Sequence, residues 1–355
     1  MKHTTHEAVA LLQQLIATPS HSRDEAATAT LLEGYFTERG IAVERIHNNI
    51  LVRSAHFDPM LPTLLLNSHH DTVRPAASYT RDPYLPTIEG DRLYGLGAND
   101  AGASVVALTQ TFLHFYEQPL PFNLLLALSA EEECGGEKGV RAWVNEVGPI
   151  DSAIVGEPTS LQAAIGERGL VVLDCEAKGV SGHAAREEGV NALYLALDDI
   201  QTLRTLRPER TSPTLGPMTI TTTMISCGTQ HNVVPDSCRF VVDCRTTDAY
   251  TNEEVVELIR SAIRSEATPR STRIRASVIA ENHPLVEAAV AVGASCFVSP
   301  TTSDRTLMPF PALKIGPGDS KRSHSADEFV LISEIEQGIE TYTKIIAHLI
   351  AKYGN

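Results

Sequence analysis

Residues 63–71 read Thr63-Leu64-Leu65-Leu66-Asn67-Ser68-His69-His70-Asp71, an apolar run that ends at two imidazoles and a carboxylate. A short apolar run of this kind predicts a buried β-strand. An acid or a histidine also follows a strand-like run at four further places, which are Asn99-Asp100, Glu131-Glu132-Glu133, Glu157 and Ser323-His324. In an open α/β sheet, ligands gather at the carboxyl ends of strands, so residues distant in sequence can meet there. Histidines and acids without cysteine are the ligand chemistry of a hydrolytic zinc site.

Composition limits the class of protein. With 355 residues, of which 43% are hydrophobic, the chain is longer than a typical single domain, and we expect a globular protein with two domains. Its net charge of -15 argues against nucleic acid or anionic membrane as a partner. The N-terminus lacks a signal-peptide pattern and no apolar run is long enough to cross a bilayer, so we expect a cytoplasmic protein. The six cysteines form no C-x-x-C pair and are expected to be reduced.

The first part of the chain predicts an α/β domain. Helical periodicity covers residues 7–16 and 24–39, and a third helix is expected over 102–116. Strand-like runs alternate with these segments, and a further helix is expected after Gly135-Gly136. Such alternation favours a largely parallel sheet covered by helices.

The middle of the chain predicts a second, inserted domain. Its strands and helices follow the order β-α-β-β-α-β, which is the split βαβ pattern of a small ferredoxin-like sheet, over 170–177, 191–206, 217–225, 238–245, 251–265 and 272–280. Since His324 lies beyond this unit, residues 1–169 and 283–355 are expected to form the catalytic domain, interrupted by an inserted domain at 170–282. A capping box at Ser333-x-x-Glu336 predicts the start of a C-terminal helix.

Each candidate site residue also has an ordinary structural explanation. Asp71 is placed to accept the second N–H of a metal-bound His69, whereas His70 would point to the other face and is interpreted as structural. Asp100 is either a helix N-cap or a carboxylate that bridges two metals. Three adjacent glutamates repel one another unless a dication stabilises them, and the alternative is a solvated acidic turn.

Five motifs, in order and over nearly the whole chain, resemble those of the co-catalytic zinc amidohydrolases. This family includes acetylornithine deacetylase, succinyl-diaminopimelate desuccinylase, aminoacylase and carboxypeptidase G. The resemblance is to its G-H-x-D-T-V, G-R-G-A-x-D, acidic-E-E, G-E-P-T and terminal His motifs, in the segments Ser68-His69-His70-Asp71-Thr72-Val73, Gly95-Leu96-Gly97-Ala98-Asn99-Asp100, Ser129-Ala130-Glu131-Glu132-Glu133, Val155-Gly156-Glu157-Pro158-Thr159 and Arg322-Ser323-His324-Ser325-Ala326-Asp327-Glu328. Leu96 replaces the arginine of the second motif, but no ligand position is lost.

The resemblance implies a zinc-exopeptidase-like fold with two zinc ions per subunit, which Co²⁺ or Mn²⁺ could replace. One zinc would be held by His69 and Glu157, the other by Glu133 and His324, and Asp100 would bridge them. It also implies that Glu132 is the general base and that Asp71 orients His69. A shift by one position among Glu131, Glu132 and Glu133 would exchange the base and ligand roles.

Within the inserted domain the resemblance continues. His183, in Val180-Ser181-Gly182-His183-Ala184, resembles a histidine that stabilises the oxyanion from across a dimer interface, which implies a homodimer through this domain. Asn232 lies in a segment similar to the family's G-x-x-x-N-x-x-P turn and is a candidate substrate ligand. Arg168 and Arg245 also match family positions, and a guanidinium can bind a carboxylate in a bidentate manner. Surface salt bridges are the competing explanation for both arginines.

The sequence therefore predicts a metal-dependent deacylase, a hydrolase of linear amide bonds. The resemblance is strongest to the acetylornithine deacetylase branch, which implies N-acetyl- or N-succinyl-ornithine or citrulline as substrate, in arginine biosynthesis. Lys321 and Arg322, near the expected metals, would favour an acidic acyl group such as succinyl. The alternatives are a di- or aminopeptidase, a succinyl-diaminopimelate desuccinylase, and a non-catalytic metal-binding protein. The last would be expected to have lost Glu132 or a ligand, and all are present.

Overall fold

The structure, a computed structural model, describes residues 2–186 and 188–354. The chain divides into two compact units. Unit 1 contains the described residues up to Ile165, together with Ile279–Phe297 and those from Ser303 onward, and unit 2 contains Gly166–Val278 and Val298–Thr302. Each unit has a hydrophobic core of its own. The predicted α/β fold class is confirmed.

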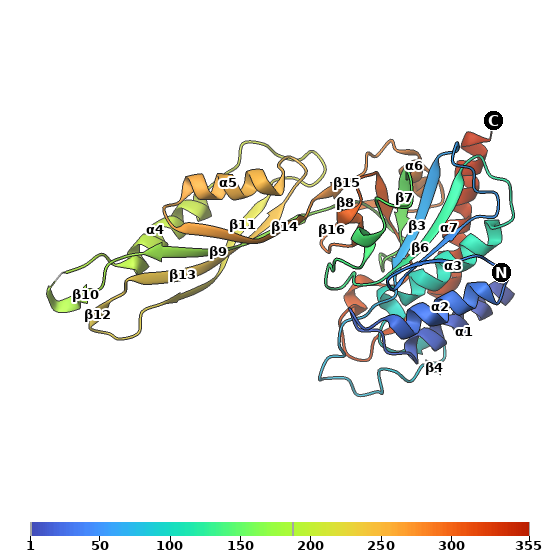
Figure 1. Cartoon of the computed structure of the whole chain (residues 1–355), viewed down its shortest axis with the longest axis horizontal. Helices are drawn as coiled ribbons and strands as arrows, with labels where there is room; N and C mark the ends of the chain where they lie inside the picture. Colours follow the sequence, from blue (N-terminus) through green and yellow to red (C-terminus); the bar gives the residue numbers. More distant parts are fainter. Residues whose placement is uncertain (1, 187, 355) are drawn as a thin grey trace. The chain divides into compact units, whose positions relative to one another are not determined.

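A mixed sheet organises unit 1 (Figure 1). Over the described residues its strand order is β1 (Glu44–Ile46), β2 (Asn49–Arg53), β6 (Asn123–Ser129), β3 (Thr63–His69), β7 (Ser152–Val155), β17 (Ala312–Lys314) and β8 (Ala163–Glu167), with β16 (Cys296–Ser299) also paired to β8. The last two residues of β8 and of β16, and all of β15 (Ser277–Val278), which pairs with the end of β8, are counted in unit 2. The central strands β6, β3, β7 and β17 are parallel to one another. Their carboxyl ends therefore lie at one edge of the sheet, as the sequence predicted.

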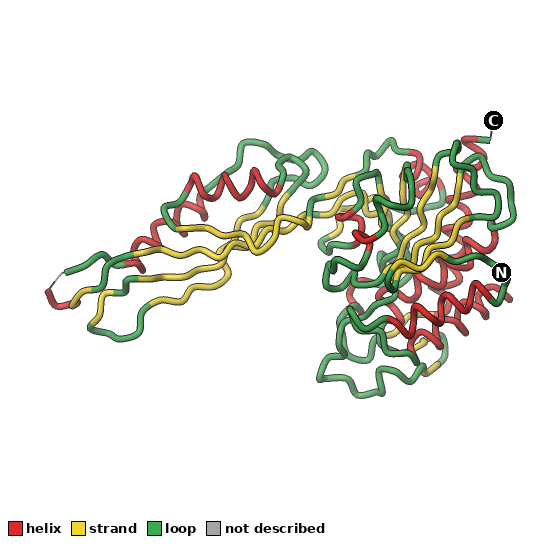
Figure 2. Tube along the Cα trace, viewed as in Figure 1, coloured by secondary structure: helices red, strands yellow, loops and turns green. Residues whose placement is uncertain are grey.

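Strand β3 shows how the sheet is covered on both faces. Leu64 and Leu66 pack into the core on the helical side, whereas Leu65 belongs to the cluster on the opposite side, as the two-residue repeat of a strand requires. The helical layer, visible in Figure 2, consists of α1 (Lys2–Ile16), α2 (Ala26–Thr37), α3 (Ala103–Phe115), α6 (Pro284–Ala291) and α7 (Ile332–Tyr353). The other face is covered by the buried Trp143 and by the short 3₁₀ helices η2 (Val140–Ala142) and η4 (Asp304–Leu307).

The helix predicted after Gly135-Gly136 is wrong, because only η2 forms there. Gly135 has φ +54°, a backbone conformation that favours glycine. A Cβ at Gly136 would lie 1.9 Å from Glu131 Oε2, and one at Gly139 would lie 2.4 Å from Ala130 O. The glycines therefore allow the chain to fold tightly onto the end of β6, and this turn replaces the helix.

The strand-like run expected directly before Asn99-Asp100, over residues 93–98, is also wrong for most of its length. Strand β5 covers only Arg92–Tyr94 and lies in a separate sheet with β4 (Thr87–Glu89) and β18 (Phe329–Leu331). Asp100 instead occupies the irregular helical turn η1 (Ala98–Gly102), directly before α3. It is therefore delivered to the site by a turn on the helical side of the sheet.

Unit 2 has the predicted β-α-β-β-α-β order. An antiparallel sheet of β11 (Thr219–Cys227), β13 (Ser237–Thr246), β9 (Gly169–Lys178) and β14 (Glu266–Ile274) packs against α4 (Ala192–Thr205) and α5 (Asn252–Ala262). A capping box between Thr251 and Glu254 opens α5. A small ribbon pairs β10 (Gly182–His183) with β12 (Val233–Val234), and β10 leads into η3 (Ala184–Arg186).

The predicted capping box of the C-terminal helix is misplaced by two residues. Helix α7 follows β18 without a loop, so Glu334 rather than Glu336 reaches back and accepts the N–H of Leu331 at 3.0 Å. Ser333 donates its hydroxyl to Asp91 instead. The register of the strand thus determines where the helix begins.

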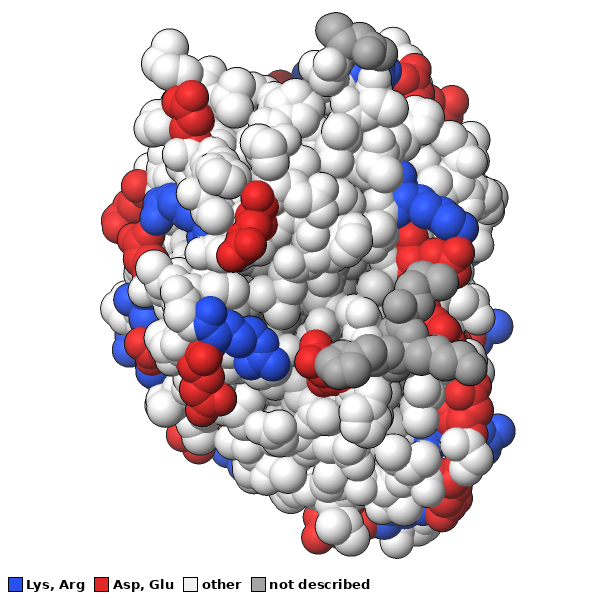
Figure 3. Space-filling view, turned by 90° about the vertical axis from the view of Figure 1, so that its right-hand side faces the viewer, with Lys and Arg blue, Asp and Glu red and all other residues white. Residues whose placement is uncertain are grey.

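On the face drawn in Figure 3, the coloured Lys and Arg side chains lie interspersed with Asp and Glu, without a broad basic area. Among the described residues, none of the helices combines the length and the apolar character needed to span a membrane.

Candidate metal centre

Five side chains from distant parts of unit 1 form two overlapping groups of metal-ligand type. The first group consists of His69, Asp100 and Glu157, and the second consists of Asp100, Glu133 and His324. In each group, one potential ligand atom per residue lies within 4.8 Å of the others. Asp100 belongs to both groups, so the two groups share one carboxylate.

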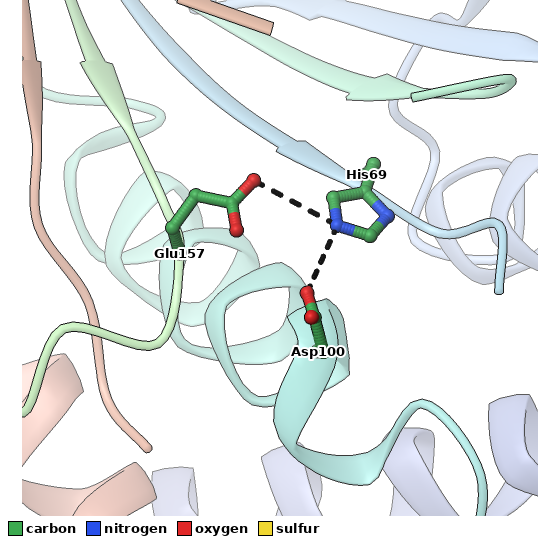
Figure 4. Close-up of side chains that lie close together, drawn as sticks. All are labelled: His69, Asp100 and Glu157. Atoms are coloured by element: carbon green, nitrogen blue, oxygen red, sulfur yellow. Dashed lines mark hydrogen bonds and ion pairs between the residues drawn. The ribbon is translucent and has the colours of Figure 1, made fainter. Parts of the chain in front are cut away.

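In the first group, His69 and Glu157 come from the ends of β3 and β7, and Asp100 comes from the turn before α3 (Figure 4). His69 Nε2 is 3.3 Å from Asp100 Oδ1 and 3.7 Å from Glu157 Oε1. The His69 side chain is only 1% exposed, so its position is fixed by packing as well as by these contacts. Burial lowers the pKa of His69, but the hydrogen bonds to Asp100 and Asp71 and the charges of Glu132 and Glu157 together raise it well above its usual range.

The second group joins the loop after β6 to the loop after β17. His324 Nε2 is 2.9 Å from Glu133 Oε2 and 3.7 Å from Asp100 Oδ2. The two oxygens of Asp100 therefore face different histidines. A carboxylate with this placement can bridge two cations, which in two-metal hydrolytic sites lie about 3.5–4 Å apart.

The donor set fits a pair of divalent cations. Imidazole nitrogens and carboxylate oxygens without a thiolate suit Zn²⁺ and similar hydrolytic metals. Burial, together with the charges of Glu157, Asp304 and Glu133, raises the pKa of Glu132 well above its usual range, although His69 opposes this. Negative charge is thus concentrated around these side chains, and dications would stabilise it.

The three adjacent glutamates differ in what they contact. Glu131, at φ +55°, turns its carboxylate back to accept the N–H of Lys138 at 3.2 Å. Glu132 Oε2 lies 3.9 Å from His69 Nε2 and belongs to neither ligand group. Glu133 pairs with His324. The geometry therefore favours Glu133 as a ligand, with Glu132 beside the metals and Glu131 in a structural role.

Asp71 connects the end of β3 to the loop that contains Glu131, Glu132 and Glu133, called the glutamate loop below. His69 Nδ1 donates to the Asp71 carbonyl at 3.0 Å, and the Asp71 carboxylate lies 3.4 Å from the same nitrogen. That carboxylate also accepts the N–H groups of Glu132 at 3.0 Å and Glu133 at 3.2 Å and the hydroxyl of Ser22 at 2.7 Å. Burial opposes ionisation of Asp71, but its interactions with His69 lower its pKa overall. One buried carboxylate thus orients residues of both ligand groups.

Replacing Asp71 by asparagine is expected to weaken metal binding about 10- to 100-fold, the usual effect of losing an outer partner of a ligand. An asparagine amide nitrogen would face a backbone N–H of the glutamate loop, because both carboxylate oxygens accept such N–H groups now. Competition with a chromogenic chelator measures the change. Ser22→Ala, which removes one donor to the same carboxylate, should have a much smaller effect, and equal losses in the two variants would refute this role.

Glu328 fixes the turn that carries Asp100, and sequence reasoning assigned it no role. Its buried carboxylate accepts the N–H of Asn99 at 2.8 Å, of Asp100 at 2.9 Å and of Gly97 at 3.0 Å. Burial and the charge of Asp100 raise the pKa of Glu328 to about 8, despite these hydrogen bonds. In the sequence, the position of Glu328 in the terminal His motif was the only indication of its role. The sequence does not show which backbone N–H groups a carboxylate will bind.

The affinity of the apoprotein for metal is expected to rise with pH up to about 9. The hydrogen bond from His324 to Glu133 raises the pKa of His324 to about 9, because it outweighs the effect of burial. A protonated imidazole cannot ligate a metal, so below this pKa its proton must leave as metal binds. Because the pKa of His69 is raised as well, the apparent affinity should increase at least about tenfold per pH unit. If the pKa of His324 were unperturbed, its deprotonation would no longer increase the metal affinity above about pH 6.5. Titration calorimetry in buffers of different ionisation enthalpy measures the released protons, and an affinity independent of pH above neutrality would contradict this expectation.

The other candidate residues lie in unit 2. His183 and Asn232 come together through the β10–β12 ribbon, in which His183 pairs with Val233 and the Ala184 N–H donates to Asn232 O at 3.1 Å. Their side chains are exposed.

The candidate arginines already have partners within their own units. Arg168 donates to the carbonyls of Leu215 and Pro217, and Arg245 pairs with Asp243 at 2.9 Å. In unit 1, Arg322 makes a bidentate pair with Glu334 at 2.7 and 3.0 Å, so it does not offer a free guanidinium to an acidic acyl group. These contacts support the salt-bridge explanation for Arg245 and a turn-stabilising role for Arg168.

Comparison with known proteins shows the family. The profile described as Peptidase family M20/M25/M40 matches residues 65–348. The chain is 29% identical to a succinyl-diaminopimelate desuccinylase of Dinoroseobacter shibae, covering 97% of this chain and 100% of that protein. It is 28% identical to an acetylornithine deacetylase of Salmonella arizonae, covering 98% of this chain and 99% of that protein.

Solved structures show the same fold at low sequence identity. Aminopeptidase PepT from Bacillus cereus superposes with a TM-score of 0.78 at 17% identity, covering 97% of this chain and 98% of that one. The Bacillus subtilis YXEP protein, described as a dinuclear metal-binding peptidase from the M20 family, superposes with a TM-score of 0.74 at 13% identity, covering 99% of each chain.

Proposed function

This chain belongs to peptidase family M20/M25/M40 and is a hydrolase of amide bonds, and from that premise we propose that it removes the acyl group from an N-acyl amino acid with two zinc ions. The observation that carries the proposal is the shared carboxylate of Asp100, whose two oxygens face His69 and His324. A single-metal protein would have no need for a second acid–histidine group on the far side of the same carboxylate.

The residues that would hold the metals are His69 and Glu157 on one side, Glu133 and His324 on the other, and Asp100 between them. Zn²⁺ bound there supplies Lewis acidity toward an amide carbonyl and toward water, and Co²⁺ or Mn²⁺ could replace it. Asp71 holds the tautomer of His69 in which Nδ1 is protonated, and so leaves Nε2 directed at the carboxylates. The site is thus preorganised by hydrogen bonds that do not depend on substrate.

Glu132 is the proposed general base. It takes a proton from the attacking water and returns it to the nitrogen of the departing amine. As a carboxylate that borders the ligand groups without belonging to either, Glu132 can both accept and release a proton. Its side chain is 13% exposed, so it borders the ligand groups while retaining access to water.

The amino-acid and acyl parts of the substrate are proposed from the relatives. A desuccinylase and a deacetylase match at nearly equal identity, 29% and 28%, so succinyl and acetyl groups are equally supported. The amine product would be ornithine, citrulline or diaminopimelate. We propose that unit 2 mediates a homodimer and that His183 and Asn232 contact the substrate; a role for Arg168 or Arg245 would require them to leave the partners described above.

A substrate panel tests this function. The metal-loaded enzyme should release free amine from N-acetyl or N-succinyl derivatives of ornithine, citrulline or diaminopimelate, and chelation should abolish the rate. Dipeptides of the Ala-Ala type serve as comparators. Faster hydrolysis of dipeptides than of every acyl substrate would overturn the deacylase assignment in favour of a peptidase.

A further inference from the structure

Two cysteines of unit 2 face each other across neighbouring strands. Cys227, the last residue of β11, is the direct register partner of Cys238 in β13. Cys238 is fully buried, and the partly buried Cys227 packs against the same hydrophobic cluster. Opposed residues of an antiparallel pair point to the same face of the sheet, so both thiols project toward this core.

Their geometry suits a disulfide. Directly opposed residues in antiparallel strands have Cα atoms about 4.5–5.5 Å apart, and disulfides join Cα atoms about 4.4–6.8 Å apart. Burial raises the pKa of Cys238, and the thiol of Cys227 lies close enough to raise it further. The Cys227 thiol also donates to Ser237 O, in the residue before Cys238, at 3.4 Å. The register of the two strands thus places Cys227 and Cys238 within the range of Cα separations that a disulfide can join.

The remaining cysteines, all within the described residues, lack such a partner. Cys175 and Cys244 line the same core, but their register partners are Phe240 and Val171. Cys134 and Cys296 are exposed. These four provide internal controls, because they report on buried and on exposed thiols in the same molecule.

The pair lies at the base of the loop that carries the candidate substrate residue Asn232. Residues 228–236 connect Cys227 to the start of β13, and within them β12 pairs with β10, which contains His183. A covalent link at Cys227 would fix both ends of this loop. It would thereby restrict the ribbon that presents His183 and Asn232.

We propose that Cys227 and Cys238 are a reversible disulfide site that responds to a low-molecular-weight disulfide such as oxidised glutathione. Its effect on turnover rests on the proposed function, in which Asn232 and His183 contact substrate. The disulfide itself does not depend on that function.

The exchange balances with the oxidant as the only co-reactant. The Cys227 thiolate attacks one sulfur of oxidised glutathione, forms a mixed disulfide and expels one glutathione thiolate. Cys238 then attacks the Cys227 sulfur and expels the second glutathione, so two protein thiols and one glutathione disulfide give one protein disulfide and two glutathione thiols. Burial and the neighbouring Cys227 raise the pKa of Cys238 to about 12, so the half-buried Cys227 is the residue that reacts first.

Peptide mapping by mass spectrometry tests the proposal on the intact, metal-loaded protein. After treatment with oxidised glutathione, we expect a cross-linked peptide containing Cys227 and Cys238, glutathione adducts on Cys134 and Cys296, and free thiols at Cys175 and Cys244. A dithiol reductant should reverse the cross-link. Cys227→Ser should abolish it, whereas the matched variant Cys296→Ser should retain it. Adducts on Cys134 and Cys296 without a 227–238 cross-link would overturn the proposal.

Kinetics separate this proposal from the proposed function. If the loop contacts substrate, the oxidised wild type should show a lower KM, because an ordered loop costs less to immobilise on binding. Neither Cys227→Ser nor the re-reduced protein should show the change. A cross-link without any kinetic change would leave the disulfide site established and would count against the substrate roles of Asn232 and His183.

Discussion

Replacing Glu132 by glutamine is expected to lower kcat roughly 10³-fold, within the range that a positioned acid or base contributes. The amide cannot accept a proton from water or deliver one to the leaving amine, whereas its size and polarity preserve the packing. Both metals should remain bound, because Glu132 lies outside the two ligand groups. Steady-state kinetics together with metal analysis of the purified variant measure the two effects separately.

The adjacent glutamate provides a matched control. Glu131 has the same side chain one position earlier, but its carboxylate is committed to the N–H of Lys138. Glu131→Gln should therefore retain kcat within a few-fold of wild type, although its stability can fall. If Glu131→Gln lost the rate and Glu132→Gln kept it, the assignment of base and structural glutamate would have to be exchanged.

Replacing Asp100 by alanine is expected to remove both metals. Asp100 is the one residue common to both ligand groups among the described residues, and its oxygens lie 3.3 Å from His69 Nε2 and 3.7 Å from His324 Nε2. Its loss should weaken each site by at least about 100-fold, the upper end of what loss of an outer partner costs. By contrast, Glu157→Ala and Glu133→Ala should each affect one site more than the other.

Metal stoichiometry after gel filtration measures this prediction. Asp100→Ala should retain close to no metal under conditions in which wild type retains two equivalents, and its activity should fall to background. Asp327→Ala is the control, because this partly buried carboxylate lies near His324 in sequence but contacts Thr80 and Arg81. Circular dichroism and the Tm show whether each variant is folded. Retention of one tightly bound metal in Asp100→Ala would contradict a bridging role.

The sequence pattern was sufficient to predict the part of the site that is formed by the ends of strands. The apolar runs before His69, Glu131 and Glu157 form β3, β6 and β7, and the parallel arrangement of these strands places their ends together. The β-α-β-β-α-β order of unit 2 was also predictable, because β9 and β13 alternate between buried and less buried residues and α5 has one apolar face.

The turns that complete the site were not predictable in the same way. Asp100 is held by Glu328, 228 residues away in sequence, through a hydrogen bond from its backbone N–H. The glutamate loop is held by Asp71 through two further backbone N–H groups. Backbone donors are common to every residue except proline, so the sequence contains no mark of which ones a buried carboxylate will bind. The tight turn at Gly135-Gly136 likewise depends on close contacts that the sequence does not show, and a helix was therefore predicted after it.

Anomalous diffraction from zinc-loaded crystals is the most direct measurement of the central claim, a dinuclear centre built around Asp100. We predict two anomalous peaks on either side of the Asp100 carboxylate, one next to His69 and Glu157 and the other next to Glu133 and His324, about 3.5–4 Å apart. A single peak in fully loaded crystals, or two peaks that do not share Asp100, would contradict the account.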